Sequence, residues 1–410
     1  MRIVTEQELR SRLASVAVDE PRVVASGNFA TPQHLLSLLD DSLERYRLFM
    51  LNAALPVPER DGVVLETPFV GPGMRRAREH LAYVPMRLSL VPHLFRRSLP
   101  PDVVVVHVSP IRSGRVSLGI EVNIIVAAIE QARARGGLVV AQVNPKMPYT
   151  FGDGEIDCEL IDFAIEVEED LPSAPKRPAS ELAAQIGENV ATFVGDGATL
   201  QLGIGAVPDA TVGAVRGRRG LAIWSEMISD GVLDLEHAGA MDPSRPVFTS
   251  FMFGSPELYA WADGNPRLQM LRTETSNDPS MIARQPGMVS INSALQVDLY
   301  AQSNASWVGT QIYSGFGGQP DFTTGALHSH GGHAVIALAS WHEKSAHSTI
   351  VPEIPTPVTS FQHSALVTEH GSAQIFGSSL SEQTRQIIGQ IAHPDARDEL
   401  ADAARELGLF

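Results

Sequence analysis

The sequence contains very little cysteine. Among its 410 residues, Cys158 is the only cysteine, so no disulfide can form within the chain. A single thiol is also too isolated to be half of a metal site. We therefore expect Cys158 to be a small buried or half-buried filler.

Targeting and membrane-spanning segments are also missing. The first ten residues, Met1 to Arg10, contain neither the apolar core nor the small-residue cleavage site of a signal peptide. No apolar run approaches the roughly 18 residues that a membrane helix needs. We therefore expect a cytoplasmic protein that makes no membrane contact.

Clustered basic charge is absent as well. The formal net charge is −16, whereas binding to a phosphate backbone depends on clustered lysine and arginine. The densest cluster, Arg75-Arg76-Ala77-Arg78, is followed by an acidic residue and is interpreted as a solvated helix face. We expect no nucleic-acid partner.

What the chain does contain is an alternation of strands and helices. With 44% hydrophobic residues, it can bury two sizeable cores, and its length favours two or three domains. The alternation favours an α/β fold with parallel-rich sheets. The first half has predicted strands at 22–26, 102–109 and 137–144 and a helix at 120–135, and the second half has helices at 183–193 and 209–215 and strands at 200–202, 221–224 and 334–339.

A proline-rich segment predicts the domain boundary. Residues 170–179 contain Pro172, Pro175 and Pro178 and show no apolar periodicity, which is typical of an extended linker. The predicted organisation is an N-terminal α/β domain over 1–172, a linker over 173–180 and a C-terminal α/β domain over 181–410.

The most informative local feature is a strand, a glycine loop and a helix start around Gly203-Ile204-Gly205. Pro208 suits the first turn of a helix, and such a construction presents N–H groups to a phosphate or an oxyanion. Pro208 replaces the third glycine of a dinucleotide fingerprint, so a nicotinamide cofactor is disfavoured. One carboxylate, Glu226, follows about one βα unit later, which suggests acyl chemistry.

Several segments in the right order resemble the acetyl-CoA hydrolase/transferase family, and most closely its 4-hydroxybutyrate and butyryl-CoA:acetate CoA-transferases, of class I. They are 195–210, 225–231, 289–299, 315–322 and 367–371. The resemblance runs from Gly27 to about Asp395, nearly the whole chain. It implies two similar open α/β domains with the active site at their interface, and a homodimer.

The resemblance also implies a nucleophile, Glu226, the glutamate of the Ser-Glu-Met segment. An unperturbed glutamate has a pKa of about 4.3, so we expect it to be ionised at neutral pH without a neighbouring base. Attack on an acyl-CoA thioester and return of the CoA thiolate would give a glutamyl-CoA thioester, which a short carboxylic acid would resolve in a ping-pong CoA transfer. With water in place of the acid, the protein would be an acetyl-CoA hydrolase. The alternative for Glu226 is a salt-bridged or surface carboxylate.

Further site residues follow from the same resemblance. A positive-φ turn is the alternative explanation of the Gly317-Gly318 pair, and simple turn chemistry is the alternative for 27–32. The residues implied for the oxyanion and acyl site are Gly317, Gly318, Gln319 and Asn28, and those implied for CoA are Gly203, Ile204, Gly205, Ala206, Val207, Ala301 and Gly325.

Four positions depart from the family pattern. Ala301 replaces a glycine in Asp298-Leu-Tyr-Ala301-Gln302, and His370 replaces a tyrosine. Thr324 and His333 replace an arginine and a lysine, so two cationic partners for CoA phosphates or an acid are missing. A protein that binds CoA without catalysis, or a regulatory protein, therefore stays an open alternative, and the acyl group is not determined.

The histidine-rich stretch His328-Ser-His330-Gly-Gly-His333 does not predict a metal centre. Zinc needs three or four ligands that converge with fixed geometry, and the glycine pair gives little rigidity. We expect no metal and no permanently bound cofactor, with coenzyme A acting only as a substrate.

Overall fold

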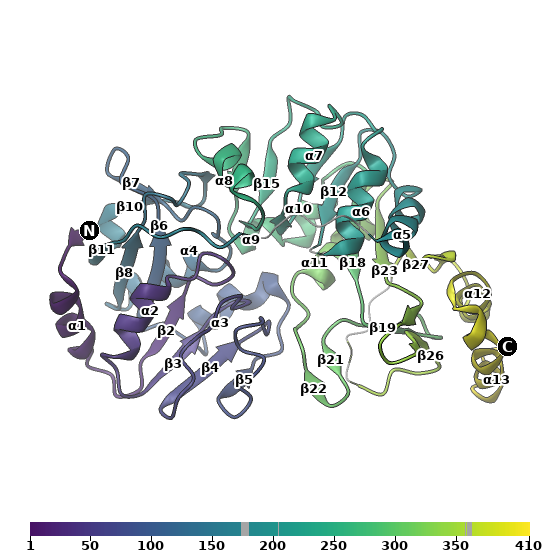
Figure 1. Cartoon of the computed structure of the whole chain (residues 1–410), viewed down its shortest axis with the longest axis horizontal. Coiled ribbons are helices and arrows are strands. Elements are labelled where there is room, and N and C mark those ends of the chain that lie inside the picture. The colour runs from purple at the N-terminus through teal and green to yellow at the C-terminus, as the bar shows by residue number, and fades with distance from the viewer. Residues whose placement is uncertain (174–179, 204, 357, 359–362) are drawn as a thin grey trace. The chain divides into compact units, whose positions relative to one another are not determined.

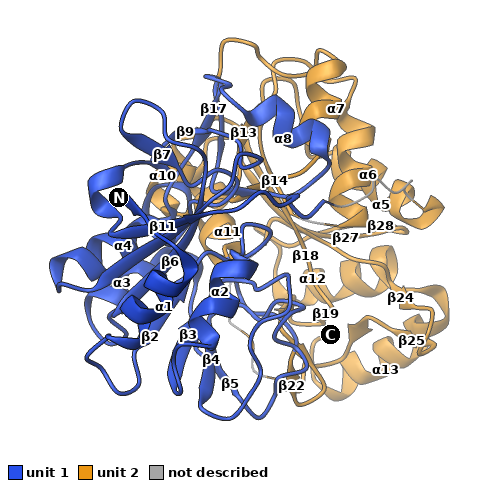
Figure 2. Ribbon diagram, turned by 60° about the vertical axis from the view of Figure 1, so that its left-hand side comes forward, with its two compact units in different colours: residues 1–175, 246–276, 313–317 blue, residues 176–245, 277–312, 318–410 orange. Residues whose placement is uncertain are grey.

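The chain forms two compact units. The structure, a computed structural model, describes residues 1–173, 180–203, 205–356, 358 and 363–410. Unit 1 comprises 1–175, 246–276 and 313–317, and unit 2 comprises 176–245, 277–312 and 318–410 (Figure 2). Most of the predicted linker, 173–180, lies outside the described residues.

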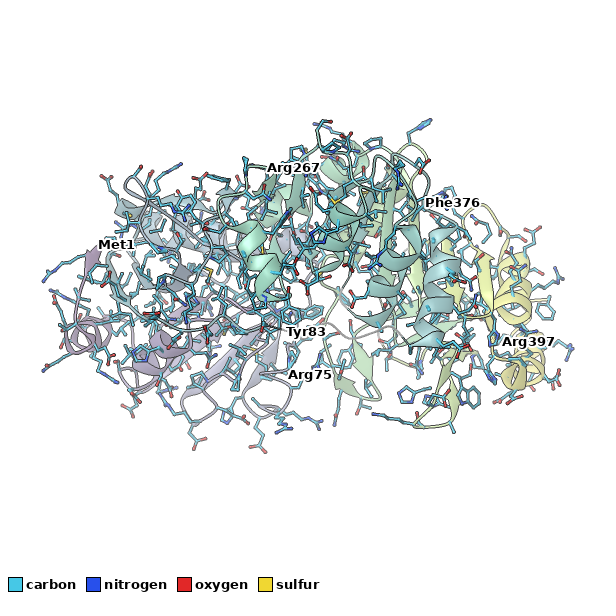
Figure 3. All side chains as sticks on the ribbon, turned by 45° about the horizontal axis from the view of Figure 1, so that its top comes forward. Met1, Arg75, Tyr83, Arg267, Phe376 and Arg397 are labelled. Carbon is cyan, nitrogen blue, oxygen red and sulfur yellow. The ribbon has the colours of Figure 1, made fainter. Side chains whose placement is uncertain are left out.

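Two segments of the predicted second domain belong to unit 1. Arg75, labelled in Figure 3, donates from Nε to the carbonyl oxygen of Tyr313 at 3.0 Å, and its guanidinium lies 3.9 Å from the centre of that ring. The N–H of Val70 donates to the carbonyl oxygen of Ser314 at 2.9 Å. Local hydrophobic periodicity does not show which unit a segment packs against. The predicted domain ranges are therefore continuous, whereas the observed units are not.

Unit 1 contains an eight-stranded sheet in which all neighbouring strands pair in parallel. Its β6 is buried at all six positions, as the β-branched run Val103 to Val106 favours for a central parallel strand. In sheet order the strands are β1 (Arg2–Ile3), β11 (Phe163–Glu166), β8 (Leu138–Val143), β6 (Val103–Val108), β2 (Arg22–Ala25), β3 (Tyr46–Phe49), β4 (Val63–Thr67) and β5 (Leu81–Tyr83) (Figure 1).

The remaining elements of unit 1 surround this sheet or come from 246–276. The helices are α1 (Glu6–Ala14), α2 (Gln33–Asp40), α3 (Val91–Arg96), α4 (Ile125–Ala134), α8 (Pro256–Ala262) and α9 (Thr273–Ser276), with the 3-10 turns η1 (Leu88–Leu90) and η2 (Cys158–Leu160). Among the other strands, β7 (Arg115–Ser117) pairs antiparallel with β10 (Glu155–Asp157). β17 (Leu268–Met270) pairs in parallel with both β15 (Val247–Thr249) and β9 (Phe151–Gly152). The last strand of unit 1 is β16 (Phe251–Met252).

Unit 2 is built around a second, mostly parallel run of strands. In sheet order these are β28 (Gly371–Gln374), β27 (Ala365–Thr368), β23 (His333–Ala337), β18 (Met288–Ser293), β12 (Thr199–Leu202) and β13 (Ala222–Trp224), with β28 antiparallel to β27. The smaller strands are β14 (Met227–Ile228), β19 (Gln296–Asp298), β20 (Ser303–Asn304), β21 (Trp307–Val308), β22 (Gln311–Ile312), β24 (Trp341–His342), β25 (His347–Ser348) and β26 (Ile350–Val351). The helices are α5 (Glu181–Ala191), α6 (Ala206–Val215), α7 (Gly231–His237), α10 (Pro279–Ala283), α11 (Gln319–His328), α12 (Leu380–Gln386), the π-helix η3 (Ile387–Ile391), the 3-10 turn η4 (Pro394–Ala396) and α13 (Arg397–Glu406).

The predicted α/β class is confirmed, and most predicted elements lie within a few residues of their expected bounds. The exception is the helix expected over 120–135, because α4 begins only at Ile125. The side chains of Glu121 and Asn123 are engaged in hydrogen bonds with each other and with the backbone, and the N–H of Val122 donates to the carbonyl oxygen of Ser250.

Cys158 is half-buried and free, as expected. In the part of the chain that the structure describes, no helix is both long enough and apolar enough to cross a membrane.

The turn that carries the alanine departure is organised by a buried aspartate. Asp298 Oδ1 accepts the backbone N–H of Tyr300 at 3.1 Å and of Gln302 at 2.9 Å. This turn forces Ala301 into the left-handed region, with φ of 62°. For an L-residue with a Cβ that conformation costs about 1–2 kcal/mol, which explains why glycine suits this position.

We predict that Ala301→Gly stabilises the protein. Relief of the left-handed strain outweighs the extra unfolded-state entropy of glycine, so the free energy of unfolding should rise by about 0.5–1 kcal/mol in urea denaturation. Ala403→Gly, inside α13, is the control and should lower that free energy by a similar amount, about 0.5–1 kcal/mol. Equal losses in both variants would contradict the strain argument.

Candidate active site

Glu226 lies two residues after the carboxyl end of β13 in unit 2. The preceding Ser225 is buried, and its hydroxyl bridges to the backbone of β12: it accepts from the N–H of Leu202 and lies 3.2 Å from the carbonyl oxygen of the same residue. This contact holds the end of β13 beside β12, so the backbone of Glu226 starts from a fixed point. Carboxyl ends of parallel strands are where α/β folds place their ligands.

Two groups hold the Glu226 carboxyl. Asn277, which is fully buried, donates from Nδ2 to Oε2 at 2.9 Å, and the backbone N–H of Gly318 also bonds to the carboxyl. A Cβ at position 318 would lie 1.7 Å from Glu226 Oε2 and 2.4 Å from Asn277 Nδ2. Only glycine therefore permits the backbone to approach this carboxyl so closely.

The environment raises the pKa of Glu226 to about 7. Burial is the main cause, because it removes water from the charged form, and the negative charge of buried Asp321 acts in the same direction. The hydrogen bonds from Asn277 and Gly318 favour the carboxylate and oppose the rise. The expectation that Glu226 is ionised like an ordinary glutamate is therefore wrong: its carboxyl has a pKa well above the usual range.

The glycine loop has the predicted strand, loop and helix geometry. β12 ends at Leu202, and Gly205 caps α6 with φ of 124°, a conformation that favours glycine. Gly205 and Ala206 are exposed and Val207 is half-buried, and the first N–H groups of a helix have no acceptor within it. Ile204 lies outside the described residues. Contact of Gly203, Gly205, Ala206 and Val207 with CoA stays a prediction.

Three other predicted site residues lie in α11 or just before it: Gly317, Gln319 and Gly325. Gly317 has φ of 57°, in agreement with a turn that needs glycine. Gln319, the first residue of α11, is buried, and its Nε2 has no hydrogen-bond partner among the described residues. Gly325 faces α10, where a Cβ would lie 2.5 Å from the Ile282 side chain, so glycine lets the two helices pack closely. Its contact with CoA stays a prediction.

Asn28, predicted for the acyl site, lies in unit 1. It follows β2, is 2% exposed and has φ of 43°. Its Oδ1 accepts a hydrogen bond from Asn52 Nδ2 at 2.6 Å. Its predicted role in the reaction is not tested by this geometry.

Within unit 2 the structure brings Glu226 and Gly318 together and adds two residues that sequence reasoning missed. Asn277 stands in Ser276-Asn277-Asp278-Pro279, which as a sequence indicates only a turn before a helix. Asp321 belongs to the glycine segment but carried no predicted role. Their proximity to Glu226, about 50 and 95 residues away in sequence, arises from the fold alone.

Three of the residues at which the resemblance implied a departure, Thr324, His333 and His370, lie in unit 2. Thr324 donates its hydroxyl to the carbonyl oxygen of Pro320 at 2.8 Å, within its own helix. Burial lowers the pKa of His333, which favours the neutral imidazole. His370 lies 3.5 Å from Glu369 Oε1 through Nε2.

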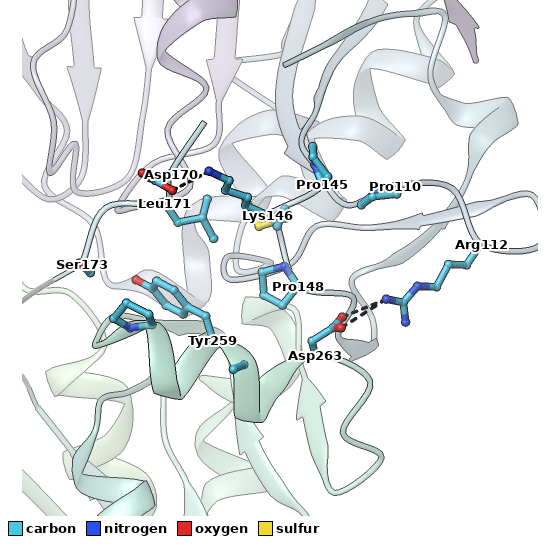
Figure 4. A pocket seen from close by; sticks show the side chains of 13 residues that line it. Pro110, Arg112, Pro145, Lys146, Pro148, Asp170, Leu171, Ser173, Tyr259 and Asp263 are labelled. Atoms are coloured by element: carbon cyan, nitrogen blue, oxygen red, sulfur yellow. Dashed lines mark hydrogen bonds and ion pairs between the residues drawn. The ribbon is translucent and has the colours of Figure 1, made fainter. Parts of the chain in front are cut away.

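A pocket of about 570 Å³ occurs in unit 1 (Figure 4). Proline rings and Tyr259 form much of its wall, and its charged side chains are paired with each other: Lys146 with Asp170 at 2.7 Å and Arg112 with Asp263 at 3.1 Å. None of the predicted site residues lines it.

In the described part of the chain, no three His, Cys, Asp or Glu side chains gather as metal ligands would.

The fold and the site define a class: α/β proteins that place a desolvated, glycine-flanked carboxyl at the end of a parallel strand, a group suited to nucleophilic attack on an acyl carbon. Comparison with known proteins agrees. A sequence model of the acetyl-CoA hydrolase/transferase C-terminal domain matches residues 254–404.

Relatives match over most of the chain. The 4-hydroxybutyrate coenzyme A transferase of Clostridium kluyveri is 38% identical over 330 residues, 78% of this chain and 76% of that protein. A succinyl-CoA:acetate/propanoyl-CoA:succinate CoA transferase of Fasciola hepatica is 36% identical over 411 residues, 94% and 85% of the two chains. The crystal structure of RipA from Yersinia pestis superposes with a TM-score of 0.90 at 28% identity, over 100% of this chain and 98% of that one. This chain belongs to the acetyl-CoA hydrolase/transferase family.

We predict that Gly318→Ala disturbs the site. The new methyl group cannot coexist with the carboxyl of Glu226 and the amide of Asn277, and such overpacking lowers the free energy of unfolding by about 1–3 kcal/mol. Chemical denaturation measures it. Gly213→Ala, on the exposed side of α6 with nothing within 4 Å of the added Cβ, is the control and should gain about 0.5–1 kcal/mol. An unchanged stability of Gly318→Ala would show that position 318 has room for a side chain.

Proposed function

We propose that this protein is an acyl-CoA:carboxylate CoA-transferase that works through a glutamyl-CoA thioester on Glu226. The observation that carries the proposal is the carboxyl of Glu226, desolvated and held by Asn277 and the N–H of Gly318. Membership of the family supports the substrate class: an acyl-CoA as donor and a short carboxylic acid as acceptor.

In the first half-reaction the Glu226 carboxylate attacks the carbonyl carbon of the acyl-CoA thioester. The C–S bond breaks, CoA leaves as a thiolate, and a mixed anhydride joins the acyl group to Glu226. The thiolate then attacks the glutamyl carbonyl carbon, which releases the acyl group as a carboxylate and leaves CoA as a thioester on Glu226. The acceptor acid reverses these steps and departs as its own CoA thioester.

Each step passes through a tetrahedral oxyanion, which needs hydrogen-bond donors where the charge develops. The N–H of Gly318 bonds to the Glu226 carboxyl and is therefore placed to donate to the oxyanion that forms on the glutamyl carbon. Asn277 Nδ2 holds Oε2 from a second direction. Both donors belong to unit 2 and are fixed before substrate arrives.

Recognition of CoA is proposed for the loop of Gly203 and Gly205 and the N-terminus of α6. The N–H groups of Ala206 and Val207 suit an anionic or carbonyl oxygen. Gly205 is exposed, and apart from its neighbours in the chain no atom of the described residues lies within 4 Å of a Cβ built there. The missing arginine and lysine make these backbone groups more important. The cytoplasmic location expected from the sequence and the homodimer implied by the resemblance stay predictions.

We expect Glu226→Gln to abolish the reaction. An amide is a poor nucleophile, so transfer of CoA from a short acyl-CoA to acetate should fall at least 10³-fold. Incubation of the unmodified protein with acyl-CoA should add CoA to the peptide that contains Glu226, as seen by peptide mass spectrometry, and the variant should carry no such adduct.

Glu188→Gln, an exposed glutamate of α5 in the same unit, is the matched control and should retain full activity. Proven CoA binding without any adduct on Glu226 would reject catalysis and favour a silent CoA-binding protein. Adduct formation with turnover that acetate does not accelerate would identify a hydrolase instead of a transferase.

The pH dependence of the first half-reaction provides an independent prediction. Only ionised Glu226 is nucleophilic, so kcat/KM for acyl-CoA should rise with pH, about tenfold per unit below a midpoint near the raised pKa of about 7. Asp321→Asn removes a negative charge and should move the midpoint to lower pH. Asn277→Ala removes a hydrogen bond to the carboxylate and should move it to higher pH. A common midpoint near the ordinary value of about 4.3 would contradict the proposed environment.

A further inference from the structure

Three aromatic side chains gather in unit 2, outside the site described above: Trp341, His370 and His393, here called the aromatic cluster. The ring centres of Trp341 and His393 lie 4.7 Å apart, and those of His370 and His393 lie 5.7 Å apart in an edge-to-face arrangement. Trp341 is half-buried, and the side chains of His370 and His393 are each 28% exposed. The proposed mechanism uses none of these rings.

Hydrogen bonds fix the backbone that carries the aromatic cluster. Glu369 accepts the N–H of Ser340 at 2.9 Å and also the hydroxyl of that serine, which joins the chain after β23, with the tryptophan, to the chain after β27. The hydroxyl of Thr368 donates to the carbonyl oxygen of Ile391 at 2.8 Å, which joins the end of η3 to the same strand. The cluster is therefore held in place before any ligand arrives.

The cluster lies at the edge of the sheet that also carries the nucleophile. β13, β12, β18, β23 and β27 are neighbours in this order and run parallel, so their carboxyl ends share one edge (Figure 1), and ligands of α/β folds bind at such an edge. Glu226 follows β13, the glycine loop follows β12, and the cluster follows β23 and β27. Because neighbouring strands are about 4.8 Å apart, the cluster lies roughly 14–19 Å along the edge from Glu226.

This separation suits coenzyme A, in which a long pantetheine arm and a diphosphate stand between the thiol and the adenine. With the thioester at Glu226 and the arm along the glycine loop, the adenine would reach the end of β23. A nucleobase and an aromatic side chain stack readily because both present flat π-surfaces.

The charges beside the cluster favour a base over a phosphate group. His370 Nε2 lies 3.5 Å from Glu369 Oε1, and His393 Nδ1 lies 3.8 Å from Asp395 Oδ2. Carboxylates repel a phosphate but accept hydrogen bonds from an amino group, and adenine carries such an amino group. Of the parts of CoA, the adenine therefore fits this surface.

We propose that Trp341, His370 and His393 form the binding platform for the adenine of coenzyme A, with Trp341 stacked on the base. The inference rests on the proposed function, because it takes CoA as the substrate, and it extends that function to the nucleotide end of CoA. Since the base is remote from the reacting bonds, loss of the platform weakens binding and leaves the chemical step unchanged.

The test compares acetyl-CoA with acetyl-pantetheine, which has the same reacting thioester but no nucleotide. In the full-length protein, Trp341→Ala should lower kcat/KM for acetyl-CoA about 10–100-fold, through KM, because the stacking is lost. The same variant should leave kcat/KM for acetyl-pantetheine unchanged. The dissociation constant of CoA, measured by isothermal titration calorimetry, should rise by the same factor.

Phe376→Ala is the matched control. It removes an exposed aromatic side chain of the same unit outside the cluster, so it should affect neither substrate. An equal loss with both substrates in Trp341→Ala would mean that the variant damages the site of Glu226, and it would overturn the inference. An unchanged dissociation constant of CoA in Trp341→Ala would overturn it as well.

If Trp341→Ala does not fold, an exposed residue of the cluster provides the same comparison. His370→Ala should weaken acetyl-CoA about 3–10-fold without affecting acetyl-pantetheine, whereas His370→Tyr, which keeps an aromatic ring, should retain the affinity for CoA. Equal affinities of CoA for His370→Ala and the unmodified protein would reject the platform.

Failure of the proposed function has a different signature. A protein that binds CoA through Trp341 but forms no CoA adduct on Glu226 would reject catalysis and retain the adenine site. Normal adduct formation, together with an unchanged KM for acetyl-CoA in Trp341→Ala, would reject only the adenine site.

Discussion

Removal of the Glu226 carboxyl from water is the interaction on which the site depends. It requires that Gly318 have no side chain, because a Cβ would lie 1.7 Å from Oε2. It also requires the amide of Asn277 in place of lost water. The end of β13, the segment before α10 and the start of α11 bring the three residues together.

This environment changes the chemistry expected of the residue. An ordinary glutamate is fully ionised at pH 7, whereas Glu226 lies near its midpoint, with a pKa of about 7. A nucleophile whose pKa is close to the working pH combines an adequate ionised fraction with a more basic oxygen. Asp321 and Asn277 act on this pKa in opposite directions, so the site contains its own means of adjusting the nucleophile.

Much of the fold followed from local sequence patterns. Buried β-branched runs such as Val103 to Val106 gave strands close to their observed bounds, and helices such as α5 were recognised from their amphipathic spacing. The start of α4 was placed too early. Glu121 and Asn123 make other hydrogen bonds, so the helix begins only after them, at Ile125. The return of 246–276 and 313–317 to unit 1 depends on long-range contacts, which periodicity does not report.

The sequence by itself determined the α/β class, the glycine loop before α6 and the candidate nucleophile Glu226, because strand composition, glycine spacing and family motifs are local properties. Only the tertiary structure decided the electrostatics. The neighbours that set the pKa, Asn277 and Asp321, come from segments distant in sequence. Glu121 likewise acquires its relation to Gly27 only when the segment before α4 lies beside the end of β2. Burial and hydrogen bonding depend on which segments the fold brings into contact, and no single segment carries that information.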